Sequence, residues 1–169
     1  MTKSFDPNQH FPLKVSDNER KRFGSDVSFI GSYAAERGET LNYLAKHGIN
    51  VRVWGNGWNN FSYESSNLKI ELRPLVNLPS NLSYTKGIVS SKINLGFLRK
   101  ANRDLHTDRS IEIPACNSFL LAERSIEHEY LFKDGAEAVF FDDDQDLLEK
   151  IRYFLTNETL RKEIATSGY

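Results

Sequence analysis

The sequence has little of several features that would place it in a specialised class of protein. It has a single cysteine, Cys116, among 169 residues, which excludes an internal disulfide. It has no run of about 18 apolar residues and no signal-peptide core, so we expect a cytoplasmic protein. Neither sign of charge dominates, with 22 Lys and Arg against 23 Asp and Glu. This balance argues against nonspecific binding to nucleic acid or anionic membranes.

Metal-binding patterns are also lacking. The four histidines, His10, His47, His106 and His128, form no pair at i, i+4. With only one cysteine beside them, no zinc-binding spacing is present. We therefore expect neither a metal site nor a bound cofactor.

The length and composition of the chain fit one globular domain, because domains cluster near roughly 100–200 residues and 39% of this chain is hydrophobic. Residues 1–25 mix Pro, Asn and a charge cluster, Glu19–Arg22, without sustained apolar periodicity, and are predicted to form an arm or linker. Residues 26–169 are predicted to form the domain.

Within residues 26–169, short apolar runs alternate with amphipathic segments. Strands are expected at 26–30 and 49–54, on either side of a helix that Gly48 ends. This is a βαβ unit, which builds parallel sheets. Further strands are expected near 69–72, 93–98, 119–121 and 138–141, with helical segments near 88–91, 126–132, after 142–144 and at 158–166. The predicted fold class is α/β, a Rossmann-like parallel sheet flanked by helices.

In such sheets, ligands bind beyond the carboxyl ends of the strands, which directs attention to three loops. The first, Gly31-Ser32-Tyr33, is followed by Arg37 and could hold a phosphate, or it could be a tight turn with a solvated arginine. The second, Gly55–Trp58, could hold a base or be a turn with a core tryptophan. The third is residues 106–117, the densest cluster of functional side chains. There Glu112 could cap a short helix or accept hydrogen bonds from ligand hydroxyls.

Four blocks of sequence carry a family resemblance. They are Asp26-Val-Ser-Phe-Ile-Gly-Ser32, Ser91-Lys-Ile-Asn-Leu95, Arg109-Ser-Ile-Glu-Ile-Pro-Ala-Cys116 with Phe119-Leu-Leu-Ala-Glu-Arg124, and Gly135-Ala-Glu-Ala-Val-Phe-Phe141 with Leu147-Leu-Glu-Lys-Ile-Arg-Tyr153. In this order they resemble the CgeB-like (spore-maturation-like) branch of the group 1 glycosyltransferases. The match is to the C-terminal, donor-binding half of the two-domain GT-B fold. The segment Pro7–Arg22 also looks like the interdomain linker of that family.

The resemblance implies a site for a nucleotide-diphosphate sugar and transfer of the sugar to an unknown acceptor, with retention of configuration. Glu112 matches the acid that holds ribose or sugar hydroxyls, and Gly31, Ser32 and Arg37 match the loop near the diphosphate. It requires no protein-bound metal and names no catalytic residue here. The substrate-binding residues that it implies are Gly31, Ser32, Arg37, Arg109, Ser110, Glu112 and Asn117.

The chain departs from the family pattern in two respects. Asn117 stands where the family has glycine, and asparagine tolerates left-handed backbone angles better than most residues. Relative to the family, the chain is also incomplete at both ends, because it lacks the N-terminal acceptor domain and stops at Ser167-Gly168-Tyr169. The missing half is therefore expected from elsewhere, as another domain or a partner chain.

Three other interpretations stay open at this level. The triplet Asp142–Asp144 could be an Asp-x-Asp metal site of a different glycosyltransferase fold, although a helix N-terminus explains it better. The triplet also resembles the acidic pocket of a receiver domain. That pocket needs further acids after the first strand, whereas here only Asp26 is present, at the start of that strand. Finally, the chain could be a noncatalytic nucleotide-binding or assembly domain that lacks the acceptor half.

Overall fold

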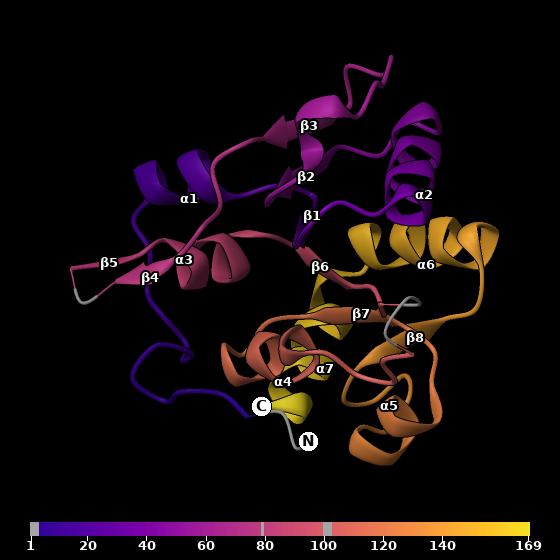
Figure 1. Ribbon diagram of the computed structural model, residues 1–169. Helices are drawn as coiled ribbons and strands as arrows, with labels where there is room; N and C mark the ends of the chain where they lie inside the picture. The colour runs from indigo at the N-terminus through magenta and orange to yellow at the C-terminus, as the bar shows by residue number, and fades with distance from the viewer. Residues whose placement is uncertain (1–3, 79, 100–102) are drawn as a thin grey trace.

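A six-stranded parallel sheet forms the centre of the computed structural model, which describes residues 4–78, 80–99 and 103–169. The strand order is β3-β2-β1-β6-β7-β8, and every pairing between neighbours is parallel (Figure 1). The sheet strands are β1 (Val27–Ile30), β2 (Val51–Trp54), β3 (Leu68–Glu71), β6 (Ile93–Gly96), β7 (Leu120–Glu123) and β8 (Val139–Phe141). A two-stranded hairpin, β4 (Asn77–Leu78) with β5 (Asn81–Leu82), lies outside this sheet.

Helices connect most of the consecutive strands of the sheet, because parallel pairing demands crossover connections. The connecting helices are α2 (Ala35–Lys46), α3 (Ser83–Ser90), α4 (Asp108–Ala115) and α5 (Ile126–Leu131), and the connection from β2 to β3 contains a 3-10 turn, η1 (Trp58–Asn60). Helix α1 (Asp17–Phe23) precedes β1, and α6 (Asp144–Thr156) and α7 (Glu158–Gly168) follow β8. In Figure 1, α2 and α6 lie side by side at one side of the sheet, while α1 and α3 lie together at the other.

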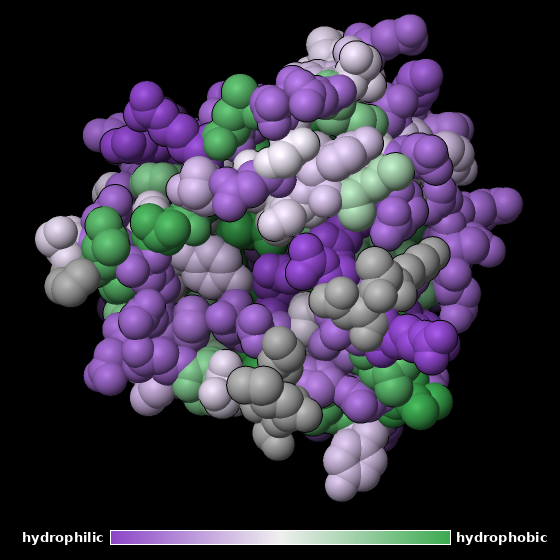
Figure 2. All heavy atoms as spheres, viewed as in Figure 1, coloured by the Kyte–Doolittle hydropathy of each residue, from purple (hydrophilic) through white to green (hydrophobic). Residues whose placement is uncertain are grey.

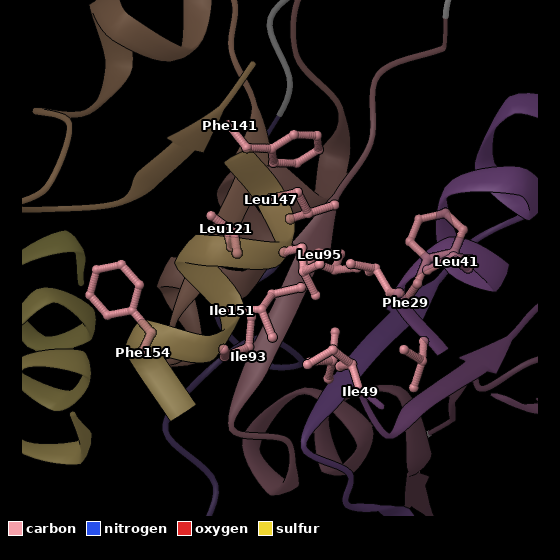
Figure 3. Packing of buried hydrophobic residues seen from close by; sticks show 14 of the residues in the cluster. Phe29, Leu41, Ile49, Ile93, Leu95, Leu121, Phe141, Leu147, Ile151 and Phe154 are labelled. Carbon is pink, nitrogen blue, oxygen red and sulfur yellow. The ribbon is translucent and has the colours of Figure 1, made fainter. Parts of the chain in front are cut away.

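The larger hydrophobic core covers one face of the sheet. Alternate strand residues, among them Phe29, Leu95 and Phe141, point into it, because successive side chains of a strand face opposite ways. Leu41 of α2 and Ile151 of α6 pack against them (Figure 3). Two edge-to-face ring contacts run through this core, from Phe29 to Phe97 and from Phe97 to Phe141.

The other face of the sheet is buried under α3 and α4. Ile30, Leu120 and Phe140 alternate with the first set of strand residues, and Ile88 of α3 and Ile113 of α4 cover them. Burial of both faces explains why apolar residues predominate in the strands, although polar residues such as Ser28, Arg52 and Asn94 interrupt them. The α/β fold class with a parallel sheet is confirmed.

The structure differs from the sequence-based expectation in four places. The predicted arm contains α1, which starts with a capping box formed by Ser16 and Glu19. The β4–β5 hairpin was not predicted, and α3 begins at Ser83 rather than near residue 88. Glu112 is not a helix cap, because α4 begins four residues before it, at Asp108.

Candidate functional site

The chain reverses direction across the sheet between β1 and β6. From β1 it proceeds outward through β2 and β3, and it then returns to pair β6 with the other side of β1. In open parallel sheets, the crevice for a ligand lies at the carboxyl ends of the strands at this switch point. The loops that follow β1, β2 and β6 and the first turn of α4 are therefore the candidate site.

The loops after β1 and β2 contact each other through two glycines. A Cβ atom on Gly55 would lie 2.1 Å from the backbone oxygen of Gly31, so only glycine fits at position 55. The indole nitrogen of Trp58 donates to the same Gly31 oxygen at 2.9 Å. Because Trp58 is buried, the Gly55–Trp58 loop is a turn with a core tryptophan, as one of the two interpretations held.

Arg37 is buried rather than solvated, with only 4% of its surface exposed. Its guanidinium donates to the backbone oxygens of Ser32 at 3.1 Å and Leu98 at 3.0 Å. It also lies over the ring of Phe29, and its Nε has no hydrogen-bond partner. Arg37 therefore joins the loops that follow the two strands at the switch point. This arrangement replaces the expectation of a solvated arginine on a tight turn.

Arginines and acidic residues both surround Arg37 at this edge of the sheet. Burial lowers the pKa of Arg37, and the charges of Arg109 and Arg99 lower it further, whereas the charges of Glu36 and Glu123 raise it. Arg109 lies in the first turn of α4, and its buried Nε also has no partner. Arg99 follows β6 and is exposed. Arg99 was not predicted as a site residue from the sequence, although it directly follows an apolar strand, where site residues are expected. Figure 2 shows strongly hydrophilic residues near the centre of the displayed face.

Glu112 lies next to this group of arginines. Its Oε2 accepts a short hydrogen bond from the hydroxyl of Tyr84 on α3, and its Oε1 lies 3.6 Å from Nε2 of His10. The side chain of Glu112 is 15% exposed. Burial raises the pKa of Tyr84, and the Glu112 carboxylate raises it further, so this phenol stays protonated and donates. A hollow of about 10 Å³ between Tyr84, Arg109 and Ile30 has room for at most one water.

Ser110 serves the structure of α4 directly. It is fully buried, and its hydroxyl lies 2.7 Å from Nε2 of His128, whose Nδ1 lies 2.7 Å from the backbone oxygen of Glu123. Because a carbonyl can only accept, His128 Nδ1 carries the proton and Nε2 accepts from Ser110. Ser110 in turn accepts from the backbone nitrogen of Thr107. The chain of bonds ties the start of α4 to the end of β7.

Asn117 lies at the opposite end of α4 from Arg109. It follows the helix and precedes β7, so it belongs to the edge of the sheet where the strands begin. There it lines a polar cleft of about 910 Å³ together with Asn50 and Asn67. Its φ of 50° is left-handed, as expected for the residue that replaces glycine. The structure therefore brings six predicted residues to the carboxyl edge and separates Asn117 from them.

The acidic triplet after β8 is held by partners of its own. Asp142 accepts from Arg124 at 2.8 Å, Asp143 caps α6 by accepting from the Asp146 nitrogen, and Asp144 accepts from Thr40 at 2.7 Å. Across the described ranges, no group of three or more His, Cys, Asp or Glu side chains is placed to hold a metal ion. A helix N-terminus therefore accounts for the triplet.

Cys116 is buried on the far side of α4 from solvent. Burial, together with the charge of Glu112, raises the pKa of its thiol to about 12. Such a thiol is protonated and unreactive near neutral pH, which matches a role in packing.

The fold is a Rossmann-like α/β domain of the kind found as the C-terminal domain of GT-B glycosyltransferases. The sequence model of the glycosyl transferase-like family matches residues 37–169, and the chain belongs to that family. A comparison with curated proteins found no significant match.

Solved structures agree with the fold at low sequence identity. The C-terminal domain of a group 1 glycosyltransferase, LpcC from Francisella tularensis, is 11% identical with a TM-score of 0.66, and the match covers 98% of this chain and 95% of that one. Sucrose-phosphate synthase from Thermosynechococcus elongatus is 11% identical with a TM-score of 0.73, over 98% of this chain and 45% of that one. Anabaena HepE, solved with UDP-glucose, is 12% identical with a TM-score of 0.67, and the match covers 97% of this chain and 49% of that one. The chain thus spans about half the length of these two larger proteins.

None of the helices in the part of the chain that the structure describes is both long enough and apolar enough to cross a membrane.

Proposed function

We propose that this chain is the donor-binding half of a glycosyltransferase and binds a nucleotide-diphosphate sugar at the carboxyl edge of its sheet. One observation carries the proposal: in a chain of the glycosyl transferase-like family, the charges of Arg37 and Arg109 act on each other at the switch point between β1 and β6, and Glu112 lies one turn further along α4. Arginines suit a diphosphate, and a carboxylate suits a ribose diol.

The proposed orientation of the donor follows from charge. Its diphosphate lies near Gly31, Ser32 and the arginines, where the N-terminus of α4 adds positive potential. Its ribose lies at Glu112. The structure of HepE with UDP-glucose supports a uridine nucleotide as the first donor to test.

In the proposed reaction, the bond between the sugar and the diphosphate breaks, the oxygen of an acceptor hydroxyl bonds to the sugar carbon, and the hydroxyl proton passes to the departing diphosphate. Negative charge develops on the departing diphosphate, and the guanidinium groups of Arg99 and Arg109 stabilise it. Arg37 holds the two loops in place and contributes its own charge. The site needs no protein-bound metal for this chemistry. The resemblance to the CgeB-like branch supports retention of configuration and an acceptor that is held by a separate domain.

The first experiment is calorimetric titration of the chain with UDP, GDP, ADP, TDP and their common sugar conjugates, with and without magnesium. We expect one diphosphate to bind in the micromolar to millimolar range. Glu112→Ala should abolish that binding, whereas Glu163→Ala, at an exposed position of α7, should leave it unchanged. Failure of every nucleotide to bind would contradict a working donor site in this chain. Binding without transfer, even when the acceptor half is supplied, would favour the noncatalytic nucleotide-binding domain.

A further inference from the structure

The N-terminal arm packs along α3 and α4 instead of extending into solvent. The backbone oxygen of Gln9 accepts from the hydroxyl of Thr85 and, at 3.4 Å, from the amide of Asn77. The next residue, His10, lies against α4, with its Nε2 3.6 Å from Oε1 of Glu112. These contacts join the arm to α3, to the hairpin and to α4, so its position beside Glu112 is fixed from three sides.

A tight turn in the arm orients His10. The backbone nitrogens of Gln9 and His10 both donate to the Asp6 oxygen, at 2.9 Å and 2.7 Å. The Asp6 backbone nitrogen donates to His10 Nδ1 at 3.1 Å. Since a backbone nitrogen can only donate, Nδ1 is an acceptor here, and the neutral imidazole carries its proton on Nε2. That N–H lies 3.6 Å from Glu112 Oε1.

Two donors from different elements therefore face the two oxygens of one carboxylate. Tyr84 donates to Oε2 from α3, and Nε2 of His10 lies beside Oε1 at 3.6 Å, a contact somewhat longer than a hydrogen bond. The two rings also meet edge to face, with centroids 5.8 Å apart. The side chain of His10 is only 10% exposed, so this geometry is held by packing. A carboxylate accepts about four hydrogen bonds, which leaves lone pairs on Glu112 for a ligand.

We propose that His10 and Tyr84 are positioning residues of the donor site, and that the arm around His10 is one of its walls. They hold the Glu112 carboxylate in a single orientation, so that its remaining lone pairs meet the two hydroxyls of the ribose. This inference rests on the proposed function. It adds to the site a residue from the segment that precedes the sheet.

The test compares UDP with 2′,3′-dideoxy-UDP, which lacks both hydroxyls that Glu112 would hold. His10→Ala and Tyr84→Phe should each weaken UDP binding by about 3- to 10-fold. Uridine should lose the same factor, because it carries the same ribose. Dideoxy-UDP should bind the wild type and both variants equally. His10→Gln should restore much of the UDP affinity, because its amide can present an N–H to Glu112.

Thermal melts of the variants establish that each one folds before its affinity is compared. Unchanged UDP affinity in both variants would overturn the inference, and so would tighter binding, which would mean that the arm competes with the ligand. An equal loss for UDP and dideoxy-UDP would assign the effect to general damage and would also overturn it. If the wild type binds no nucleotide, the proposed function fails and this inference fails with it. If the wild type binds UDP and both variants bind it with the same affinity, only this inference fails and the proposed function stands.

Discussion

Arg37 and Leu98 lie 61 residues apart in the sequence, and the guanidinium of Arg37 donates to the Leu98 backbone oxygen at 3.0 Å. A second bond from the same guanidinium reaches Ser32. A flat group with several fixed donors can bridge two loops in this way, whereas an ammonium group on a flexible stem cannot hold the same fork. One side chain thereby sets the spacing of the two loops at the switch point.

Arg37→Ala should weaken UDP binding more than uridine binding, because the change removes charge near the diphosphate. Arg37→Lys should keep part of the affinity through its charge, yet lose the link between the two loops. Calorimetry with both ligands measures the difference, and Arg22→Ala, in α1, serves as the control. An equal loss for UDP and uridine would contradict the assignment of Arg37 to the phosphates.

His128 should make the stability of the domain depend on pH. Burial lowers its pKa below the ordinary value of 6.5, so at mildly acidic pH the unfolded chain binds more protons than the native one. Stability from this residue is complete above pH 6.5 and is lost as the pH falls toward the native pKa. Urea unfolding between pH 5 and pH 8 should show this decline.

The variant His128→Gln tests the origin of that decline. It should cost about 1–3 kcal/mol at pH 7.5, because Ser110 and the Glu123 carbonyl lose a well-placed partner. It should also flatten the pH dependence. His47→Gln, at an exposed position, should leave the slope as it is. A slope that survives in His128→Gln would assign the pH dependence to other groups.

Gly55→Ala should damage the carboxyl edge of the sheet. The added methyl group would lie 2.1 Å from the Gly31 oxygen, so one of the two loops must move. We expect a loss of about 3 kcal/mol or more, because backbone strain and overpacking combine. Gly48→Ala is the matched control, since its φ is 84° but no atom lies within 4 Å of the new methyl group. Equal losses in the two variants, measured by urea unfolding, would show that the close approach is unimportant.

Asn117 should affect folding but not ligand binding. Asn117→Val should destabilise the domain by about 1–2 kcal/mol, because its φ of 50° disfavours a branched side chain. Asn117→Gly should fold at least as well as the wild type. Both should bind UDP with unchanged affinity, because the position lies at the edge where the strands begin. A clear loss of UDP affinity in Asn117→Gly would return this residue to the binding site.

Local patterns were enough to predict most of the sheet. The runs near 26–30, 49–54, 93–98 and 138–141 are rich in apolar residues, because strands buried on both faces place apolar side chains on each. Polar residues interrupt the first three runs, and the run at 49–54 alternates between apolar and polar residues. α1 was missed although Ser16 and Glu19 form its capping box, because a seven-residue helix shows too few apolar positions for a period. The β4–β5 hairpin has strands of two residues each, which carry no pattern at all.

The sequence by itself determined the α/β class, because periodicity and the order of strands are local properties of the chain. It also made the carboxyl edge of the sheet the expected ligand site and, together with the family resemblance, made Arg37 and Glu112 candidates there. Only the tertiary structure decided which groups these side chains meet. Arg37 meets Leu98, Ser110 meets His128, and Glu112 meets both Tyr84 and His10. These partners lie far apart in the sequence, and their pairing depends on how strands and helices pack, which spacing along one chain does not encode.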